Sequence, residues 1–337
     1  MIVLSILLVT IISFVSTIIV RKMALQKNQL DIPNERSSHI SPTPRGAGIA
    51  IVIAFCVGML VLCLNDTVTN RVLFSLVLPG LIIAIIGRLD DLTLVTSAKW
   101  RLIGHFLCAI AAVWLMGGLP ALPFFESTID FGVVGNITAV IYLVWMLNLF
   151  NFMDGIDLIT GIQTLSTSVA IAVFLFMKSE SDLWAVFAVL AAAVVGFLYF
   201  NLPPAKIFLG DVGSGFIGFT LGAISLVVAK DEPLIAWSTI ILLGVFVTDA
   251  TVTLLRRLIS LERVYIAHRT HAYQHMSKKI NRHLPISLSV GAINIFFLLP
   301  IAWLVAEAKL LPLVGVLLAY VPLAGAALLL GAGKKIS

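Results

Sequence analysis

Two amides and two carboxylates, spaced three residues apart, close a long apolar run: Asn148, Asn151, Asp154 and Asp157. Each step of three falls back about 60° around a helix, so the first three share one side. The glycine after Asp154 lets Asp157 turn toward the same space. Carboxylates at the rim of a bilayer are costly unless they face water, a cation or a partner. The stretch therefore predicts one wall of a site for Mg²⁺-dependent phosphoryl transfer.

A second polar segment, residues 31–48, is rich in Pro and Gly and carries Arg36, His39 and Arg45. Arginines held on such a turn-rich path suit bidentate contacts with phosphate. Positive charge kept at one membrane face would explain the arginines, but not the Pro, Gly and His around them. We expect these three side chains to bind phosphate.

Asp90 and Asp91 follow directly after another apolar run. Adjacent carboxylates repel each other unless a cation or a shared proton relieves them. Mg²⁺ commonly takes one or two carboxylates together with phosphate oxygens and water. The alternative is a pair of solvated acids neutralised by Arg88, Lys99 or Arg101, and the pair alone does not exclude it. Lys99 is also a candidate contact for a substrate phosphate.

Asp211 lies between glycines in the segment 201–215, immediately before an apolar run. Glycines allow close backbone approach, and the free N–H groups at a helix start favour an anion. An aspartate there would also serve as an N-cap, but a cap requires neither the glycines nor Lys206 and Phe208 beside it. Phe208 could stack on a planar base.

The last polar loop is long and basic, and it contains His268, Arg269 and His271. Histidines three residues apart could bind Zn²⁺, but no third ligand accompanies them. Hydrogen bonding to phosphate is therefore favoured, with a merely solvated basic loop as the alternative. Asp249 lies within the preceding apolar run, where an acid is a site candidate. It could equally pair with an arginine at the end of its helix.

Composition places these groups in a polytopic membrane protein. Of the 337 residues, 60% are hydrophobic and 12% are charged, and the mean hydropathy is +1.09. A soluble domain carries about 25% charged residues. We expect an all-α fold in a single domain, residues 1–337, with about eleven transmembrane helices. The expected spans are 2–20, 46–64, 71–87, 101–119, 134–153, 161–177, 183–200, 213–229, 234–255, 285–305 and 310–330.

The distribution of Lys and Arg predicts the orientation. With eleven spans, 18 of the 22 basic residues fall on one side; the exceptions are Arg71, Lys178, Lys230 and Lys309. Positive residues gather on the cytoplasmic side, so we expect the N-terminus outside and the C-terminus in the cytoplasm. Every polar cluster above then lies on the cytoplasmic face. Orientation also accounts for the net charge of +5, and no nucleic-acid partner is expected. Together the clusters indicate a phosphate-bearing substrate joined to a lipid.

These motifs make the sequence resemble the polyprenyl-phosphate N-acetylhexosamine-1-phosphate transferases of glycosyltransferase family 4. The family includes the lipid I synthase of peptidoglycan and the initiators of O-antigen. The resemblance runs from Arg36 to His271. Its most specific parts are Pro44-Arg-Gly-Ala-Gly, Asp90-Asp91, Asn148-x-x-Asn151-x-x-Asp154-Gly-Ile-Asp157, Phe208-x-Gly-Asp211-x-Gly-Ser and His268-x-x-His271.

The resemblance implies transfer of a sugar 1-phosphate from a UDP-sugar to polyprenyl (undecaprenyl) phosphate, with release of UMP. It implies Mg²⁺ as the cofactor, with Mn²⁺ as an alternative. Asp211 would ligate the metal, with Asp91 and Asp154 as further ligands. Asp90 would be the base that deprotonates the lipid phosphate, assisted by Asp91. In-line attack is expected, and a covalent aspartyl-phosphate route stays open.

The resemblance also implies which side chains hold the substrates. Those expected around the uridine diphosphate are Asn151, Asp154, Asp157, Asn201 and Phe208, with Phe208 against the uracil. His268 and His271 would steady the pyrophosphate or the sugar. The other expected substrate contacts are Arg36, His39, Arg45, Lys99, Asn148, Lys206 and Arg269.

Two departures from the family pattern bear on the substrate. Leu158 stands where the family usually has Gly, so the turn after Asp157 is expected to differ in shape. The segment 268–274 lacks the three consecutive histidines of the lipid I enzyme and looks closer to the O-antigen initiators. This favours a UDP-N-acetylhexosamine over UDP-MurNAc-pentapeptide, and lipopolysaccharide O-antigen synthesis at the bacterial inner membrane as the setting.

Two other classes of protein remain as alternatives. An intramembrane aromatic prenyltransferase also uses Mg²⁺ and Asp-rich motifs, but in paired Asp-x-x-x-Asp form. An ion-coupled transporter would place polar residues near the middle of the bilayer, whereas here they gather at one rim. The sequence leaves the oligomeric state open, a homodimer included.

Overall fold

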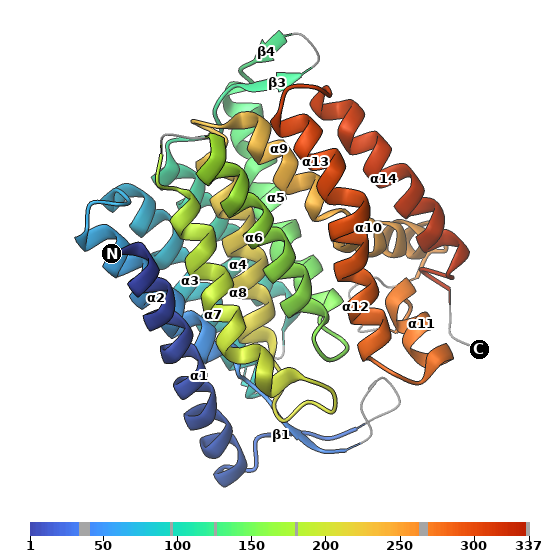
Figure 1. The fold of residues 1–337 in the computed structure, drawn as a ribbon. Helices are drawn as coiled ribbons and strands as arrows, with labels where there is room; N and C mark the ends of the chain where they lie inside the picture. Colours follow the sequence, from blue (N-terminus) through green and yellow to red (C-terminus); the bar gives the residue numbers. More distant parts are fainter. Residues whose placement is uncertain (34–40, 95–96, 125–126, 179–180, 263–268, 335–337) are drawn as a thin grey trace.

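The computed structural model describes residues 1–33, 41–94, 97–124, 127–178, 181–262 and 269–334, and these are predominantly helical (Figure 1). The helices are α1 (Ile2–Gln26), α2 (Gly48–Leu64), α3 (Asn70–Asp91), α4 (Ala98–Met116), α5 (Gly132–Met153), α6 (Ile159–Lys178), α7 (Trp184–Asn201), α8 (Asp211–Val228), α9 (Pro233–Leu242), α10 (Gly244–Ile259), α11 (Ala272–Ile280), α12 (Leu284–Ile293), α13 (Leu299–Ala306) and α14 (Pro312–Leu329). Asn294–Leu298 forms a π-helical turn between α12 and α13.

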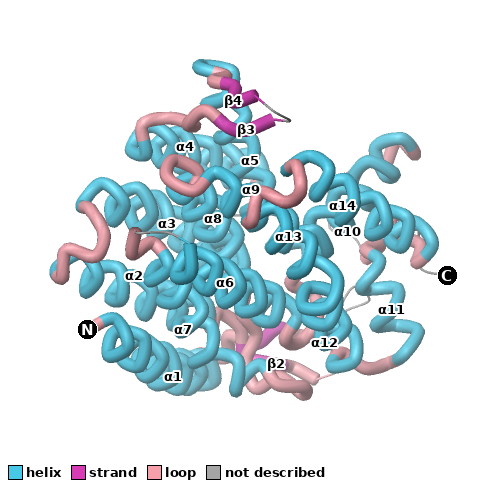
Figure 2. Tube along the Cα trace, turned by 45° about the horizontal axis from the view of Figure 1, so that its top comes forward, coloured by secondary structure: helices cyan, strands magenta, loops and turns pink. Residues whose placement is uncertain are grey.

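Two short antiparallel pairs complete the fold: β1 (Leu30–Asp31) with β2 (Thr43–Pro44), and β3 (Leu122–Phe124) with β4 (Ser127–Ile129). Figure 2 shows the β3–β4 pair standing at one end of the helical bundle. The expected all-α class is confirmed for the described residues.

Within the described residues, nine helical segments are long and apolar enough to cross a membrane, and Leu284–Ala306 counts as one of them. A tenth span arises if α9 and α10, which are bent by 62° at Leu243, form one broken span. The remaining expected span corresponds to α2, an apolar helix of 17 residues that is shorter than the nine. Every expected run is therefore helical, and the spans differ in length more than the sequence suggested.

Several expected boundaries differ from the helix ends: α1 runs on to Gln26, α3 to Asp91 and α10 to Ile259, against expected ends at 20, 87 and 255. The fourth span was expected at 101–119, but α4 ends at Met116. Gly117 takes the left-handed conformation with φ of +82°, and Gly118 follows at +87°. Glycine adopts this conformation without a steric penalty and commonly ends helices in this way. At its other end α4 begins three residues earlier than expected, so Lys99 belongs to its first turn.

Helix α8 occupies the centre of the bundle, and nearly all its residues are buried. Its glycines allow neighbouring helices to come very close. A Cβ on Gly48 of α2 would lie 2.2 Å from the Cα of Gly213, and a Cβ on Gly218 would lie 2.4 Å from the carbonyl oxygen of Met146 in α5. Small residues at helix contacts provide tight packing in membranes, where burial of apolar surface gives little driving force.

The polar loops meet at the end of the bundle opposite the β3–β4 pair. The N–H of Phe208 donates to the carbonyl of Pro44 at 2.8 Å, the N–H of Leu158 donates to Asn201 Oδ1 at 2.7 Å, and the Tyr273 hydroxyl donates to the Phe152 carbonyl at 3.0 Å. These contacts join loops that are more than 100 residues apart in some cases. The expected convergence of the polar segments on one face is confirmed.

Candidate active site

The first turn of α8 is capped by a carboxylate from another helix. Gly210, which precedes α8, has no side chain that could accept an N–H bond, and its φ is +77°. Asp91, at the end of α3, takes this role: its Oδ1 accepts the N–H of Asp211 at 2.9 Å and its Oδ2 accepts the N–H of Val212 at 3.3 Å. A Cβ at position 210 would lie 2.6 Å from Asp91 Oδ2, so glycine is needed for this approach. Negative charge at a helix N-terminus is stabilising.

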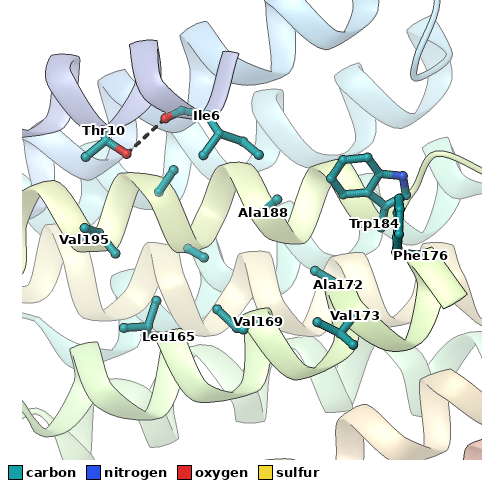
Figure 3. Close-up of a pocket in the computed structure, with 12 residues that line it drawn as sticks. Ile6, Thr10, Leu165, Val169, Ala172, Val173, Phe176, Trp184, Ala188 and Val195 are labelled. Carbon is teal, nitrogen blue, oxygen red and sulfur yellow. Dashed lines mark hydrogen bonds between the residues drawn. The ribbon is translucent and has the colours of Figure 1, made fainter. Parts of the chain in front are cut away.

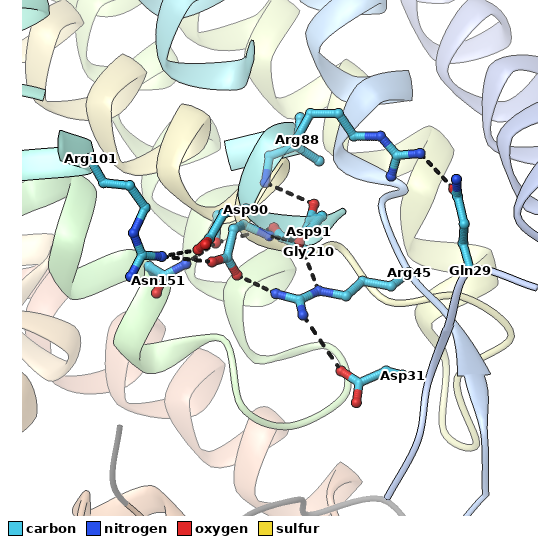
Figure 4. A network of polar contacts seen from close by, with 12 residues as sticks. Gln29, Asp31, Arg45, Arg88, Asp90, Asp91, Arg101, Asn151 and Gly210 are labelled. Atoms are coloured by element: carbon cyan, nitrogen blue, oxygen red, sulfur yellow. Dashed lines mark hydrogen bonds and ion pairs between the residues drawn. The ribbon is translucent and has the colours of Figure 1, made fainter. Parts of the chain in front are cut away.

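Arg45 holds the same carboxylate (Figure 4) and links it to Asp211. Its Nε lies 2.8 Å from Asp91 Oδ1, and its Nη2 donates to Asp211 Oδ1 at 2.5 Å. Asp31 Oδ2 lies 4.0 Å from Nη1. Burial lowers the pKa of the Arg45 guanidinium, but the three carboxylates outweigh burial and raise the pKa overall. Arg45 is therefore a permanent cation in this cluster.

Asp90 faces away from Asp91 although the two are adjacent in sequence. Consecutive residues of a helix are about 100° apart, so one side chain meets α8 while the other meets α4. Asp90 Oδ2 pairs with Nη1 of Arg101, which also lies 3.8 Å from Asp211 Oδ2. Asp211 thus lies between two guanidiniums, those of Arg45 and Arg101, and its side chain is 23% exposed.

A cavity of 590 Å³ opens beside this cluster. The charged and amide side chains that line it are Arg45, Asp90, Arg101, Asn148, Asn151, Asp154, Asp211 and Gln274. The rings that line it are His105, Phe152, His271 and Tyr273. Its apolar lining includes Ile83, Ile86, Ala98, Leu102 and Leu147. Strong charges of both signs thus share one space with an apolar surface at the end of the bundle.

The predicted helical face of α5 is confirmed, because Asn148, Asn151 and Asp154 all line the cavity. Asn148 Nδ2 donates to the Val144 carbonyl at 2.7 Å, and Asn151 Nδ2 donates to Ser214 Oγ at 3.3 Å. Asp154 follows the last residue of α5. Burial raises the pKa of its carboxyl to about 8.

Asp157 does not turn toward this cavity, and that expectation is corrected. Its carboxylate is buried, with Oδ2 accepting the N–H of Ala205 at 3.3 Å and lying 3.1 Å from Nδ1 of His283. The Ser287 hydroxyl donates to the Asp157 carbonyl at 2.6 Å. Asp157 therefore connects the start of α12 with the segment 202–210. The physical reason is that the N–H of Ala205 needs an acceptor inside the fold, and the Asp157 carboxylate supplies it.

Asn201 is also a connecting residue and does not line the cavity. Its Oδ1 accepts the N–H of Leu158, and its Nδ2 donates to the Ile207 carbonyl at 3.2 Å. Leu158 itself has φ of +68°, in the left-handed region that glycine adopts freely. The turn after Asp157 was expected to differ in shape because Leu158 replaces the usual glycine. Leu158 nevertheless adopts a backbone conformation that suits glycine, so the replacement does not require a different turn.

Three other expected substrate contacts lie outside the cavity lining. Phe208 pairs with Arg45 through backbone atoms, and its carbonyl accepts the N–H groups of Gly46 and Ala47 at 3.1 and 3.0 Å. Lys206 is exposed, with its ammonium 4.2 Å from the ring centroid of Tyr199. Lys99 is exposed in the first turn of α4. In this conformation the segment 206–208 holds Arg45 in place rather than lining the cavity itself.

The histidine loop is held by Asp249 of α10. Asp249 is buried, and its two carboxylate oxygens accept the N–H groups of Ala272 at 2.9 Å and Tyr273 at 3.0 Å. Neither sequence alternative for Asp249, a site acid or the partner of an arginine, describes this arrangement. His271 is the N-cap residue of α11 and lies 3.3 Å from Asp249 Oδ1. Asp249 thus fixes α11 in the same way that Asp91 fixes α8.

Some expected site residues are not placed. Arg36, His39 and His268 lie outside the described residues. Arg269 is half-buried just before His271 and is not part of the cavity lining.

The sequence reasoning missed several residues that line the cavity. Arg101 was regarded only as a neutralising charge, and Tyr273 and Gln274 were not weighed. His105 lies inside an apolar run, and ionisable residues in membrane spans mark functional sites by default. The position of His105 in an apolar run could therefore have identified it as a site residue. Its Nδ1 is buried without a hydrogen-bond partner among the described residues, so the cavity contains an unsatisfied polar ring.

The carboxylates do not form a preassembled metal cage. No group of three or more His, Cys, Asp or Glu side chains is arranged to hold a metal ion in the described part of the chain. Asp91, expected as a ligand, is only 1% exposed and is bonded to α8 and Arg45. Of the expected ligands, Asp154 and Asp211 line the cavity; Asp90 lines it too but is paired with Arg101. This donor set suits a hard cation that draws its other ligands from water and substrate phosphates.

Two further cavities have a different character. One of 570 Å³ lies between α1, α6 and α7 (Figure 3). Aliphatic and aromatic side chains line it, together with the hydroxyl of Thr10. That hydroxyl donates to the Ile6 carbonyl at 3.0 Å. Another of 400 Å³ lies under β3 beside Trp237 and Tyr142. Neither lining contains an acid or a base, so the charged cavity is the candidate active site.

Comparison with known proteins identifies relatives of this arrangement. Residues 73–229 match the family described as Glycosyl transferase family 4, a range that covers α3 from Leu73 onward and α4 to α8. A probable undecaprenyl-phosphate N-acetylglucosaminyl 1-phosphate transferase of Bacillus subtilis is 29% identical over 77% of this chain and 73% of its own. An undecaprenyl-phosphate alpha-N-acetylglucosaminyl 1-phosphate transferase of Thermotoga maritima is 29% identical over 86% and 87%.

A third relative carries a different sugar in its name. The phospho-N-acetylmuramoyl-pentapeptide-transferase of Bacillus licheniformis is 31% identical over 64% of this chain and 69% of its own. All three relatives are named as transferases of a phosphorylated sugar.

Proposed function

Because the chain belongs to glycosyl transferase family 4, we propose that it transfers an N-acetylhexosamine 1-phosphate from a UDP-sugar to undecaprenyl phosphate and releases UMP. The chain is a multi-pass membrane enzyme of the phosphosugar transferase class. Family membership decides against the aromatic prenyltransferase and the transporter. The observation that carries the proposal is the 590 Å³ cavity, in which Asp211 lies between Arg45 and Arg101 and which Asp154 also lines.

The cavity chemistry fits two phosphate-bearing substrates. Arg45 and Arg101 provide guanidinium groups for phosphate oxygens, and the ring of His105 also lines the cavity. Asn148 and Asn151 offer amides to a base or a sugar. The apolar lining from α3 and α4 suits the first isoprene unit of a lipid phosphate. The cavity therefore has complementary groups for each part of the proposed reaction.

The reaction is an in-line displacement at phosphorus. An oxygen of the lipid phosphate attacks the sugar-bearing phosphorus of the donor, a new P–O–P bond forms, and the bond to the UMP oxygen breaks. A phosphate monoester has a second pKa of about 6, so the lipid phosphate is mostly dianionic at neutral pH and needs little help from a base. We propose that Asp90 orients Arg101, with which it is paired, rather than acting as the base. Positioning and neutralisation of charge supply most of the acceleration.

Mg²⁺, with Mn²⁺ as the alternative, fits as the cofactor. Asp211 and Asp154 would hold it, together with oxygens of the donor diphosphate. When bound, the ion supplies positive charge that stabilises the developing charge on the phosphates. Asp91, with both oxygens bonded to α8 and Arg45, is no longer proposed as a ligand and instead keeps Asp211 in position.

The sugar is proposed from the relatives and from the histidine loop. Two relatives are named for N-acetylglucosamine and one for N-acetylmuramoyl-pentapeptide. The segment 268–274 lacks three consecutive histidines, which favours a simple UDP-N-acetylhexosamine. The product would begin a cell-envelope glycan such as O-antigen, made at the cytoplasmic face of a bacterial inner membrane.

A panel of donors tests the proposal. Purified protein with undecaprenyl phosphate and Mg²⁺ is expected to release UMP from UDP-N-acetylglucosamine or another UDP-N-acetylhexosamine. UMP is quantified by chromatography, and each reaction is repeated without lipid phosphate as the control. Release from UDP-MurNAc-pentapeptide alone would assign the enzyme to lipid I synthesis. No lipid-dependent UMP release from any donor would refute the proposed transfer.

The apparent affinity for Mg²⁺ is expected to depend on pH through Asp154. Its carboxyl has a raised pKa of about 8, and a cation binds the carboxylate form. Below pH 8 the metal must displace a proton, so the half-saturating Mg²⁺ concentration should rise as pH falls, by up to about tenfold per unit. Initial rates at varied Mg²⁺ between pH 6.5 and 8.5 measure this. Asp154→Asn should flatten the dependence, and an equally steep dependence in that variant would contradict the assignment.

A further inference from the structure

Helix α11 forms one wall of the cavity. This helix is short, and contacts with neighbouring segments hold it in place. His271, Tyr273 and Gln274 line the cavity, and α11 has only nine residues. A helix of this length is not stable alone in water. Asp249 holds its first N–H groups, and the Tyr273 hydroxyl binds the Phe152 carbonyl. These contacts fix the wall from the side of α10 and α5.

The last turn of the described chain fixes the same wall from another side. We call residues 331–334 the C-terminal clasp. The N–H of Gly333 donates to the carbonyl of Thr270 at 2.7 Å, next to His271. His275 Nε2 is 3.0 Å from the Lys334 carbonyl, within α11 itself. After α14 the described chain ends beside α11, as Figures 1 and 2 show. The clasp therefore binds the residues that come immediately before and after the cavity-lining segment.

The clasp is both packed against and hydrogen-bonded to its neighbours. Ala332 is fully buried and packs with Ala272 and Ala327. Arg256 Nη1 donates to the Ala332 carbonyl at 3.1 Å. Gly333 has φ of +78°, and a Cβ there would lie 2.8 Å from Arg256 Cβ. Glycine is thus required at this position for both conformation and space.

None of the clasp residues lines the cavity, so any effect on catalysis must be indirect. We propose that the C-terminal clasp is a positioning element of the active site, which holds His271, Tyr273 and Gln274 against the substrates. The proposal rests on the proposed transferase function for its kinetic readout. A small displacement of positioning groups can slow an enzyme strongly, because reacting atoms must be held close to their attack geometry.

Gly333→Ala tests the clasp. Its methyl group collides with Arg256, and its backbone disfavours the required φ. We expect kcat for transfer to fall about tenfold or more. Amide hydrogen exchange should become faster in residues 270–275, while the N–H groups of Asp211 and Val212, held by Asp91, keep their protection. Gly325→Ala is the matched control, because a Cβ there meets nothing within 4 Å.

A second pair of variants covers the case in which Gly333→Ala does not fold. Arg256→Ala removes the donor to Ala332, and Arg256→Lys keeps a cationic donor; the lysine variant should recover most of the kcat that the alanine variant loses. Unchanged kcat and unchanged exchange in folded Gly333→Ala, or equal kcat in the two Arg256 variants, would overturn the positioning role. If the wild-type protein transfers no sugar phosphate, the proposed function fails, and the exchange experiment still decides whether the clasp holds α11.

Discussion

Replacing Asp211 by Asn is expected to lower kcat for sugar-phosphate transfer by about a hundredfold to a thousandfold while the protein stays folded. The carboxylate faces the cavity between Arg45 and Arg101 and is a proposed ligand for Mg²⁺. The amide has the same shape but neither the charge nor a second acceptor oxygen. The fold should persist because the tie between α3 and α8 uses the backbone N–H of Asp211, and Arg45 keeps its contact with Asp91.

UMP release at saturating donor and lipid phosphate measures the loss, and folded yield in detergent shows that it is not structural. Asp66→Asn is a matched control, because Asp66 is exposed in the turn after α2 and its φ of +55° suits asparagine. Unchanged turnover in Asp211→Asn would remove this residue from the proposed metal site.

Asp91 should behave differently, because its carboxylate serves the fold. Asp91→Ala leaves two part-buried N–H groups of α8 without this acceptor and takes one carboxylate away from Arg45. Leaving a helix N–H group without its acceptor costs about 1–3 kcal/mol, and Arg45, which is one-third exposed, keeps Asp211 as a partner, so folded yield and the thermal unfolding temperature should fall. Asp91→Asn keeps an acceptor oxygen and should lose much less stability.

The two Asp91 variants also separate the two roles considered for this residue. If Asp91 caps α8, Asp91→Asn keeps part of both stability and turnover. If it were a metal ligand, Asp91→Asn would be folded normally but would lose turnover as completely as Asp211→Asn. Thermal unfolding in detergent and UMP release, measured on the same preparations, distinguish these outcomes.

Several features of the site follow from local sequence alone. Asn148, Asn151 and Asp154 share a helical face because the helix repeat places residues three apart near one another. The apolar runs predicted the helices, since about 20 apolar residues are needed to cross a bilayer. The distribution of charge predicted that the polar loops would meet at one end of the bundle, and they do.

The errors have a common cause. Asp157 and Asn201 looked like substrate contacts but satisfy backbone groups of neighbouring loops. Asp249 was considered as a site acid and in fact caps α11. A buried N–H group without an acceptor is costly, and an aspartate that supplies the acceptor cannot be recognised from its own segment.

The sequence by itself determined that this chain is a helical membrane protein with most of its basic residues and its candidate site acids gathered at one end, because hydropathy and charge act locally along each span. Only the tertiary structure decided which acids face the cavity and which cap a helix. Asp90 and Asp91 are neighbours in the chain, yet one pairs with Arg101 at the cavity and the other binds the first turn of α8. That division depends on where α8 and α4 pack against α3, and packing between distant segments is not encoded in the spacing of any one motif.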